Sequence, residues 1–153
     1  MKFEKIKSKG EIKDSFSGNY LIDSSEKEAR KIIASLGDKN FGGNIGVLGR
    51  DDAFNRRAVE TLKINYLFSP ERGEKRDSLK QRDSGINHVV AKEAANKGIA
   101  IVIDFDEVSR LKSKEKAIRI GRIIQNIKIC RKAQCKIKIF GSVDKTSLIS
   151  FVF

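Results

Sequence analysis

The chain has 153 residues, of which 34% are charged and 39% hydrophobic, and this length is typical of one domain. No apolar run approaches the ~20 residues that a membrane span needs, and the charged amino terminus does not resemble a secretion signal. The net charge of +12 and the presence of only two cysteines predict a cytoplasmic protein that is attracted to polyanions and does not associate with membranes.

The predicted elements alternate along the chain. Strands are expected at residues 20–22, 45–48, 64–68, 99–103 and 136–140, and helices at about 25–37, 51–62, 87–98 and 114–133. Ser25 and Glu28 form a capping box, and Asn87 is a second helix cap. Strands separated by helices predict an α/β fold with a parallel sheet, in a single domain that comprises residues 1–153. A complete (β/α)8 barrel needs roughly 200 residues or more, so the barrel would be truncated or the sheet open.

Positive charge is concentrated in residues 110–138, the basic segment. This segment contains eleven basic residues and a single acid, Glu115, so its net charge is +10. Clustering of one sign is typical of nucleic-acid binding, whereas an ordinary solvated surface intersperses the signs. The predicted RNA-binding residues are Arg110, Lys112, Lys114, Lys116, Arg119, Arg122, Lys128, Arg131, Lys132, Lys136 and Lys138. A secondary patch is predicted in the polar connection 71–84, at Arg72, Lys75, Arg76, Lys80 and Arg82.

A step of 100° per residue assigns the faces of the long predicted helix. This places on the core side Ile120, Ile123, Ile124, Ile127 and Cys130. Arg119, Arg122 and Asn126 then face outward. Ile118 and Ile129 lie off the core side, either as ordinary exposed residues or as a partner-binding surface. The absence of Trp and Tyr from the basic segment favours contact with the backbone of a folded RNA over base stacking.

Two blocks carry a family resemblance: SGINHVVAKEAANKGIAIVIDF at 84–105 and KAIRIGRIIQNIKICRKAQCKIKIFGS at 116–142. Together with Leu67-Phe68-Ser69-Pro70 just upstream, they extend over about residues 45–142. In this region the chain resembles ribonuclease P protein component 3, the TIM-barrel-like subunit of archaeal and eukaryotic ribonuclease P.

The resemblance implies a TIM-barrel-like fold of the polymerase-and-histidinol-phosphatase type that lacks most of the last βα units. It also implies a subunit of a ribonucleoprotein hydrolase, an endonuclease that removes the 5′ leader from precursor tRNA. In that family the RNA carries the active site and uses magnesium, so this chain would bind no cofactor or metal and would have no catalytic residue. The implied partners are ribonuclease P RNA, precursor tRNA through the holoenzyme, and ribonuclease P protein component 2, in a heterotetramer.

Two other functions are compatible with the sequence. A metal-dependent phosphoesterase or nuclease could use Asp104 and Asp106, which follow a predicted strand where barrel enzymes place their sites. Such sites need several histidines, and His88, the only one, is interpreted as a hydrogen-bonded structural residue beside its helix cap. A different RNA-assembly scaffold is the second alternative. Cys130 and Cys135 lack further zinc ligands and are interpreted as reduced thiols.

Overall fold

The computed structural model describes residues 2–14, 16, 18–39, 41–79 and 82–141. A single sheet of parallel strands runs through them, and each strand pairs with the next in chain order. The strands are β1 (Phe3–Ile6), β2 (Asn19–Ile22), β3 (Ile45–Leu48), β4 (Tyr66–Phe68), β5 (Ala100–Asp104) and β6 (Ile137–Phe140). The helices are α1 (Glu26–Asp38), α2 (Asp52–Thr61), α3 (His88–Lys97), α4 (Phe105–Ser109) and α5 (Ser113–Ala133), with 3-10 turns η1 (Lys9–Glu11) and η2 (Pro70–Arg72).

The expected strands and helices are confirmed, with ends that shift by one or two residues. Side-chain oxygens of Ser25, Asp51 and Asn87 accept hydrogen bonds from backbone N–H groups in the first turns of α1, α2 and α3. The sequence pattern did not predict β1 or α4. β1 has one fully buried residue, Ile6, and therefore little hydrophobic pattern, and α4 is a single five-residue turn of helix. No described helix has the length and hydrophobicity that crossing a membrane requires.

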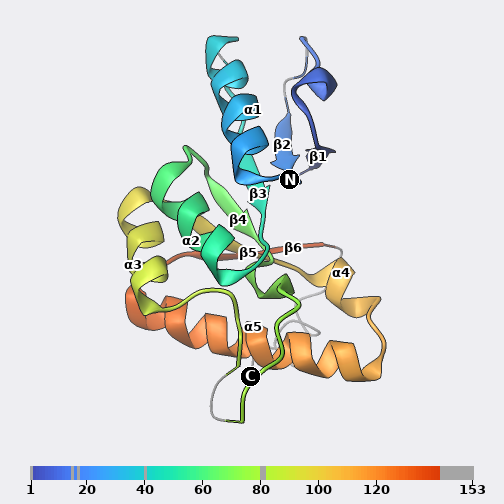
Figure 1. Cartoon of the computed structure of the whole chain (residues 1–153), viewed down its shortest axis with the longest axis vertical. Coiled ribbons are helices and arrows are strands. Elements are labelled where there is room, and N and C mark those ends of the chain that lie inside the picture. Colours follow the sequence, from blue (N-terminus) through green and yellow to red (C-terminus); the bar gives the residue numbers. More distant parts are fainter. Residues whose placement is uncertain (1, 15, 17, 40, 80–81, 142–153) are drawn as a thin grey trace.

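The helices cover one face of the sheet (Figure 1). A parallel sheet whose strands follow chain order needs crossovers of one hand, which place every helix on the same side. The largest core cluster accordingly joins one face of the strands to residues of α1, α2, α3 and α5. The sheet turns strongly from β1 to β6, so that the two ends run in different directions in Figure 1. This α/β arrangement is consistent with a TIM-barrel-like fold.

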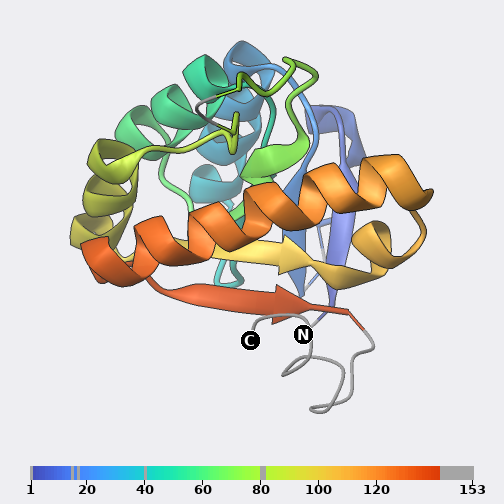
Figure 2. The same cartoon turned by 90° about the horizontal axis from the view of Figure 1, so that it is seen from below.

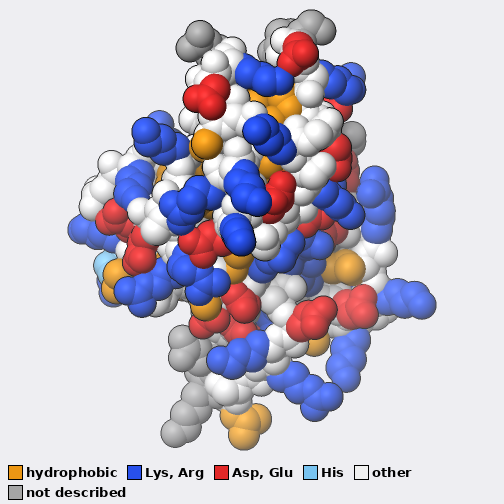
Figure 3. All heavy atoms as spheres, turned by 45° about the horizontal axis from the view of Figure 1, so that its top comes forward, with side chains coloured by type: hydrophobic (Ala, Val, Ile, Leu, Met, Phe, Trp, Pro, Cys, Tyr) orange, Lys and Arg blue, Asp and Glu red, His pale blue; other side chains and the backbone are white. Residues whose placement is uncertain are grey.

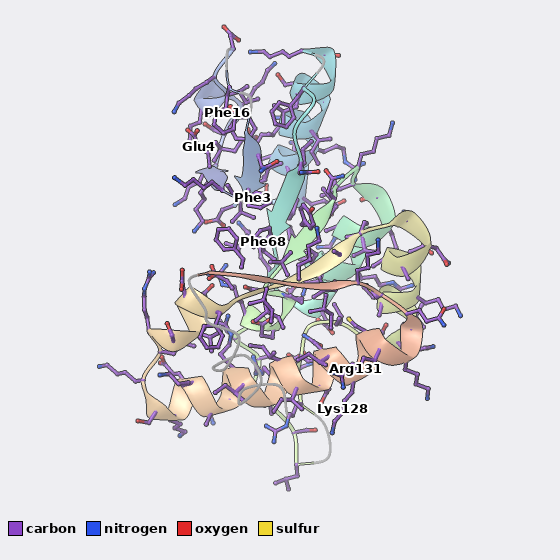
Figure 4. All side chains as sticks on the ribbon, turned by 180° about the vertical axis from the view of Figure 1, so that it is seen from behind. Phe3, Glu4, Phe16, Phe68, Lys128 and Arg131 are labelled. Atoms are coloured by element: carbon purple, nitrogen blue, oxygen red, sulfur yellow. The ribbon has the colours of Figure 1, made fainter. Side chains whose placement is uncertain are left out.

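Aromatic side chains fill the other, inner face of the sheet. Leu48, Tyr66, Phe68, Ala100 and Val102 form a second buried cluster there, with Phe3, Leu21 and Phe140 packed against it. The Phe3 ring contacts Phe68 with centroids 4.9 Å apart and Phe140 with centroids 5.9 Å apart, both edge-on. Figure 4 shows Phe3 and Phe68 together on this face. The first and last strands are thus joined through side chains, although they are not neighbours in the sheet.

Asn55 holds together three connections at the carboxyl ends of the strands. Its side chain is fully buried, and its amide nitrogen donates to the carbonyl oxygens of Pro70 at 2.9 Å and Gly85 at 3.0 Å. Its amide oxygen accepts from the Arg50 N–H at 2.8 Å. Gly85 has φ +83°, and a Cβ there would lie 2.6 Å from the Pro70 carbonyl carbon. This contact explains why glycine opens the Gly85-Ile86-Asn87-His88 motif.

Replacing Asn55 by Asp should strongly destabilise the fold. The variant places an acceptor oxygen opposite the Pro70 and Gly85 carbonyls, and about 3 kcal/mol of unfolding free energy should be lost. The control is Asn96→Asp, the same chemical change at an exposed position of α3, which should stay within about 0.5 kcal/mol. Urea unfolding measures both variants, and equal values for the two would contradict the role given to Asn55.

Candidate nucleic-acid interface

The cations of the basic segment are divided between the surface and the interior. Figure 2 shows α5 lying across the molecule beside β5 and β6, with one long side that no other described helix or strand covers. Within the described residues, the cations that are exposed or half-exposed and have no carboxylate partner are Arg110, Lys112, Lys114, Lys116, Lys128, Lys132 and Lys136. Arg131 is also exposed on the carboxyl-terminal half of α5, near Lys128 (Figure 4). The lysines of this set could approach a polyanion without breaking an ion pair.

Arg122, by contrast, is 5% exposed and points into the loop before α3, which is the polar connection 71–84. Its guanidinium donates to the Asp77 carboxylate at 3.0 Å and to the carbonyl oxygens of Glu71, Gly73 and Lys75 at 3.0, 2.7 and 2.6 Å. A planar fork with five N–H donors suits such a set of oxygens, and a lysine could not satisfy it. Arg122 therefore anchors the amino-terminal half of the loop to α5.

Arg119 also lies mostly buried, in a small network of charges. Its guanidinium contacts the carboxylates of Glu71 and Glu107, each at 3.1 Å, and Glu107 also pairs with Arg72 at 3.2 Å. Glu71 is 1% exposed, and its burial raises the pKa of the carboxyl above the ordinary value of 4.5, while neighbouring Arg119 opposes the rise. The network connects the loop, α4 and α5.

The predicted orientation of α5 is therefore wrong in part: Ile123, Ile127 and Cys130 are buried as predicted, but the polar side chains assigned to solvent are not exposed. Arg122 and Asn126 are buried and Arg119 is 12% exposed at its side chain, whereas Ile124, assigned to the core, is 36% exposed. The isoleucines of this helix are spread around most of its circumference, so hydrophobic spacing did not select one face. Oxygen atoms of the loop determine which face is buried, because they accept hydrogen bonds from Arg122 and Asn126, the polar side chains that helical spacing assigned to solvent. Arg119 and Arg122 are bound within the protein and do not belong to the surface that a polyanion would meet.

Gln125 and Asn126 hold the second half of the loop. The Gln125 side chain donates to the Arg82 carbonyl at 3.1 Å and to the Ser84 hydroxyl at 3.0 Å. The Asn126 side chain donates to the Ser84 carbonyl at 2.8 Å. The loop thus follows α5 at both ends of its path, and the polar face of the helix provides the hydrogen-bond partners for backbone that has no regular secondary structure.

The secondary patch adjoins the amino-terminal half of α5. Lys75 and Arg76 are exposed, and they line a groove of about 670 Å³ with Lys114, Leu111 and Ile118. Arg72 forms an ion pair with Glu107. Lys80 lies outside the described residues. Lys138, predicted with the α5 cations, lies on the inner face of the sheet, where its ammonium donates to the Tyr66 hydroxyl at 3.1 Å and lies 5.0 Å from the ring centroid.

The candidate catalytic residues do not assemble into a site. The Asp104 carboxylate caps α4 by accepting a hydrogen bond from the Glu107 N–H. Among the described residues, no group of three or more His, Cys, Asp or Glu side chains is placed to hold a metal ion. His88 begins α3 and is exposed, and the hydrogen bond expected for its ring is absent from the described part of the chain.

The predicted partner-binding pair is separated by burial. Ile118 is 37% exposed, but Ile129 is half-buried and packs against the main core. Of the two, Ile118 is the one that offers apolar surface.

Cys130 and Cys135 are both buried free thiols, as the sequence predicted.

Fold and surface together define an α/β protein with a parallel sheet whose strands follow chain order, and with an outer helix that carries exposed cations. No family model matches the chain. It is similar to ribonuclease P protein component 3 of Methanocaldococcus jannaschii, with 30% identity over 117 residues, which is 76% of this chain and 47% of the relative. The protein of the same name from Methanococcus vannielii is 22% identical over 129 residues, covering 84% of this chain and 52% of the relative. The resemblance to protein component 3 is confirmed, and the chain spans about half the length of these relatives.

Two solved structures share the fold. A chain in the structure of archaeal ribonuclease P with mature tRNA aligns with 99% of this chain and 81% of its own, at a TM-score of 0.51 and 17% identity. The crystal structure of an uncharacterized protein aligns with 82% of this chain and 34% of its own, at a TM-score of 0.56 and 12% identity. At these identities the likeness is one of fold.

The buried Glu71 carboxyl predicts a pH dependence of stability. Because its pKa is raised on folding, its stabilising contribution is complete below about pH 4.5 and is lost as the pH rises through the folded-state value. Wild type should therefore lose unfolding free energy relative to Glu71→Gln as the pH rises above about 4.5, as measured in urea. Glu74→Gln, at an exposed position in the same loop, is the control. A difference that moves the opposite way would mean that the ion pair with Arg119 outweighs burial.

Removing the Arg122 guanidinium should release the loop. Arg122→Met leaves the Asp77 carboxylate and three carbonyl oxygens without the hydrogen bonds of the guanidinium, and the unfolding free energy should fall by about 3–5 kcal/mol. Trypsin should then cleave native protein faster after Lys75 and Arg76. Lys128→Met, an equivalent change at an exposed position of the same helix, should leave both readouts near wild type. Equal cleavage rates in the two variants would argue against the anchoring role.

Proposed function

We propose that this chain is a protein subunit of ribonuclease P, the ribonucleoprotein that removes the 5′ leader from precursor tRNA, and that it binds and stabilises the catalytic RNA. The observation that carries the proposal is the row of exposed lysines along α5, which have no carboxylate partner in the described part of a chain similar to protein component 3. Half of the relatives' length lies outside the match, so activity, substrate and partners are hypotheses for this chain.

The distribution of ion pairs supports α5 as the RNA-binding side. Cations on α1 and α2 are mostly neutralised locally: Arg30 and Arg57 both contact Glu26, and Arg56 contacts Glu60. Figure 3 shows Lys and Arg next to Asp and Glu over much of that face. On the outer side of α5 the lysines have no such partners among the described residues. Phosphates that approach α5 meet uncompensated charge, whereas on α1 and α2 they must compete with carboxylates.

We propose that the chain itself is not catalytic and that magnesium acts at the RNA. The geometry supports this because the carboxylates near the carboxyl ends of the strands already have partners: Asp23 lies 3.7 Å from Lys5 and 3.8 Å from Arg50, and Glu107 pairs with Arg72 and Arg119. Hydrolysis of precursor tRNA by the purified chain without any RNA component would contradict it.

The remaining parts of the proposal follow the family resemblance. The fold would be a barrel of the polymerase-and-histidinol-phosphatase type. The protein partner would be ribonuclease P protein component 2, in a heterotetramer, and Ile118 would contribute exposed apolar surface beside the 670 Å³ groove. The complex would be cytoplasmic. Analytical ultracentrifugation with component 2 tests the stoichiometry.

Neutralising two outer lysines should weaken RNA binding in a salt-dependent way. In Lys128→Gln/Lys132→Gln, the log–log slope of affinity against salt for ribonuclease P RNA of Methanocaldococcus jannaschii should fall by about 0.9 for each lost contact with a duplex phosphate. The matched control, Arg30→Gln/Lys31→Gln on α1, removes the same charge from ion-paired positions and should leave the slope almost unchanged. Filter binding over a range of KCl concentrations gives both slopes, and identical slopes would refute the assignment of α5.

A further inference from the structure

Gly121 and Arg82 form a contact between α5 and the loop that the sequence did not suggest. Gly121 lies within α5, and a Cβ built on it would lie 2.7 Å from the Arg82 guanidinium carbon. The nearest three atoms to that position all belong to this guanidinium. The Arg82 guanidinium therefore occupies the space that a side chain at position 121 would fill. Helix interiors disfavour glycine by about 1 kcal/mol relative to alanine, so the residue is not there for helix stability.

The backbone around Arg82 is held on both sides. Gln125 donates to the Arg82 carbonyl at 3.1 Å, the Asp83 N–H donates to Asp77 at 2.7 Å, and Asn126 donates to the Ser84 carbonyl at 2.8 Å. The Arg82 side chain, in contrast, is exposed and has no carboxylate partner among the described residues. A fixed backbone with an uncompensated, exposed guanidinium is an arrangement that presents the charge to a ligand.

The position of this charge completes a row along the helix. Lys114, Gly121 and Lys128 are spaced by seven residues, so they lie almost in line, with a drift of about 20° per step. At 1.5 Å per residue, about 21 Å separate Lys114 from Lys128 along the axis, and the exposed residues of α5 from 117 to 127 are uncharged. Charges act over about 8 Å at physiological ionic strength, so the gap would divide the helix into two separate patches. Arg82 lies near its middle, about 10 Å from each of these two lysines along the axis, which halves the gap to little more than one Debye length.

We propose that Arg82, seated on Gly121, contacts a phosphate of the bound RNA as the middle member of a continuous row formed with Lys114, Lys128 and Lys132. The inference rests on the proposed RNA binding and adds to it a specific position for Arg82. The sequence assigned this residue to a separate secondary patch, but the structure places its guanidinium on α5, about forty residues downstream in the chain. Gly121 is a positioning residue, since it acts only by leaving room for the guanidinium.

Substitutions at Gly121 test the proposal because they move the guanidinium without changing the charge of the protein. Gly121→Ala and Gly121→Gln should each weaken binding of ribonuclease P RNA of Methanocaldococcus jannaschii by about fivefold to tenfold, as should Arg82→Gln. The salt slope should fall by about 0.9 in each variant. Gly121→Ala combined with Arg82→Gln should lose no more affinity than Arg82→Gln alone, because both remove one contact.

Gly37→Ala is the matched control, since Gly37 also lies in a helix but a Cβ added to it would have no neighbour within 4 Å. Both Gly→Ala variants should keep or raise the urea midpoint, and Gly37→Ala should bind RNA like wild type. Wild-type affinity in Arg82→Gln, or in both Gly121 variants, would overturn the inference while leaving the proposed function intact. Failure of the wild-type chain to bind RNA at all would instead overturn the proposed function.

Discussion

The burial of the Arg122 guanidinium is the interaction on which the rest of this structure depends. A buried cation is tolerated only when nearly all of its N–H groups are satisfied, and here one carboxylate and three carbonyl oxygens of the loop satisfy them. The requirement is mutual, because the loop has no strand or helix partners for those carbonyls. Once this contact forms, the rotation of α5 is determined, and with it the set of side chains that reach solvent.

Two of the three arginines of α5 consequently differ in role from its lysines, while Arg131 is exposed as the lysines are. Arg119 and Arg122 point inward, where planar forks bind carboxylates and carbonyls, while Lys114, Lys128 and Lys132 remain at the surface. This division follows from the chemistry of the two groups, since a guanidinium is weakly hydrated and directional and an ammonium is strongly hydrated. The high net charge of the chain is therefore an imperfect guide to the charge available for a polyanion.

The sheet imposes a second constraint. With the described helices on one face, side chains of the strands pack against one another on the inner face, as the ring contacts of Phe3 with Phe68 and Phe140 show. Buried polar residues organise the connections at the carboxyl ends of the strands. Asn55 joins the connections that contain Arg50, Pro70 and Gly85, and Arg122 joins the loop to α5.

The sequence by itself determined most of the elements and the segment in which positive charge is concentrated. Capping by Ser25 and Asn87 and the aliphatic strand at β5 are local properties, so the pattern of neighbouring residues was sufficient to predict them. Tertiary structure alone decided which cations face outward, that Ile124 is exposed, and that Arg82 lies on Gly121. The physical reason is distance along the chain: the oxygens that bury Arg122 and the loop that brings Arg82 to α5 come from residues some forty or fifty positions earlier, and no helical periodicity encodes that contact.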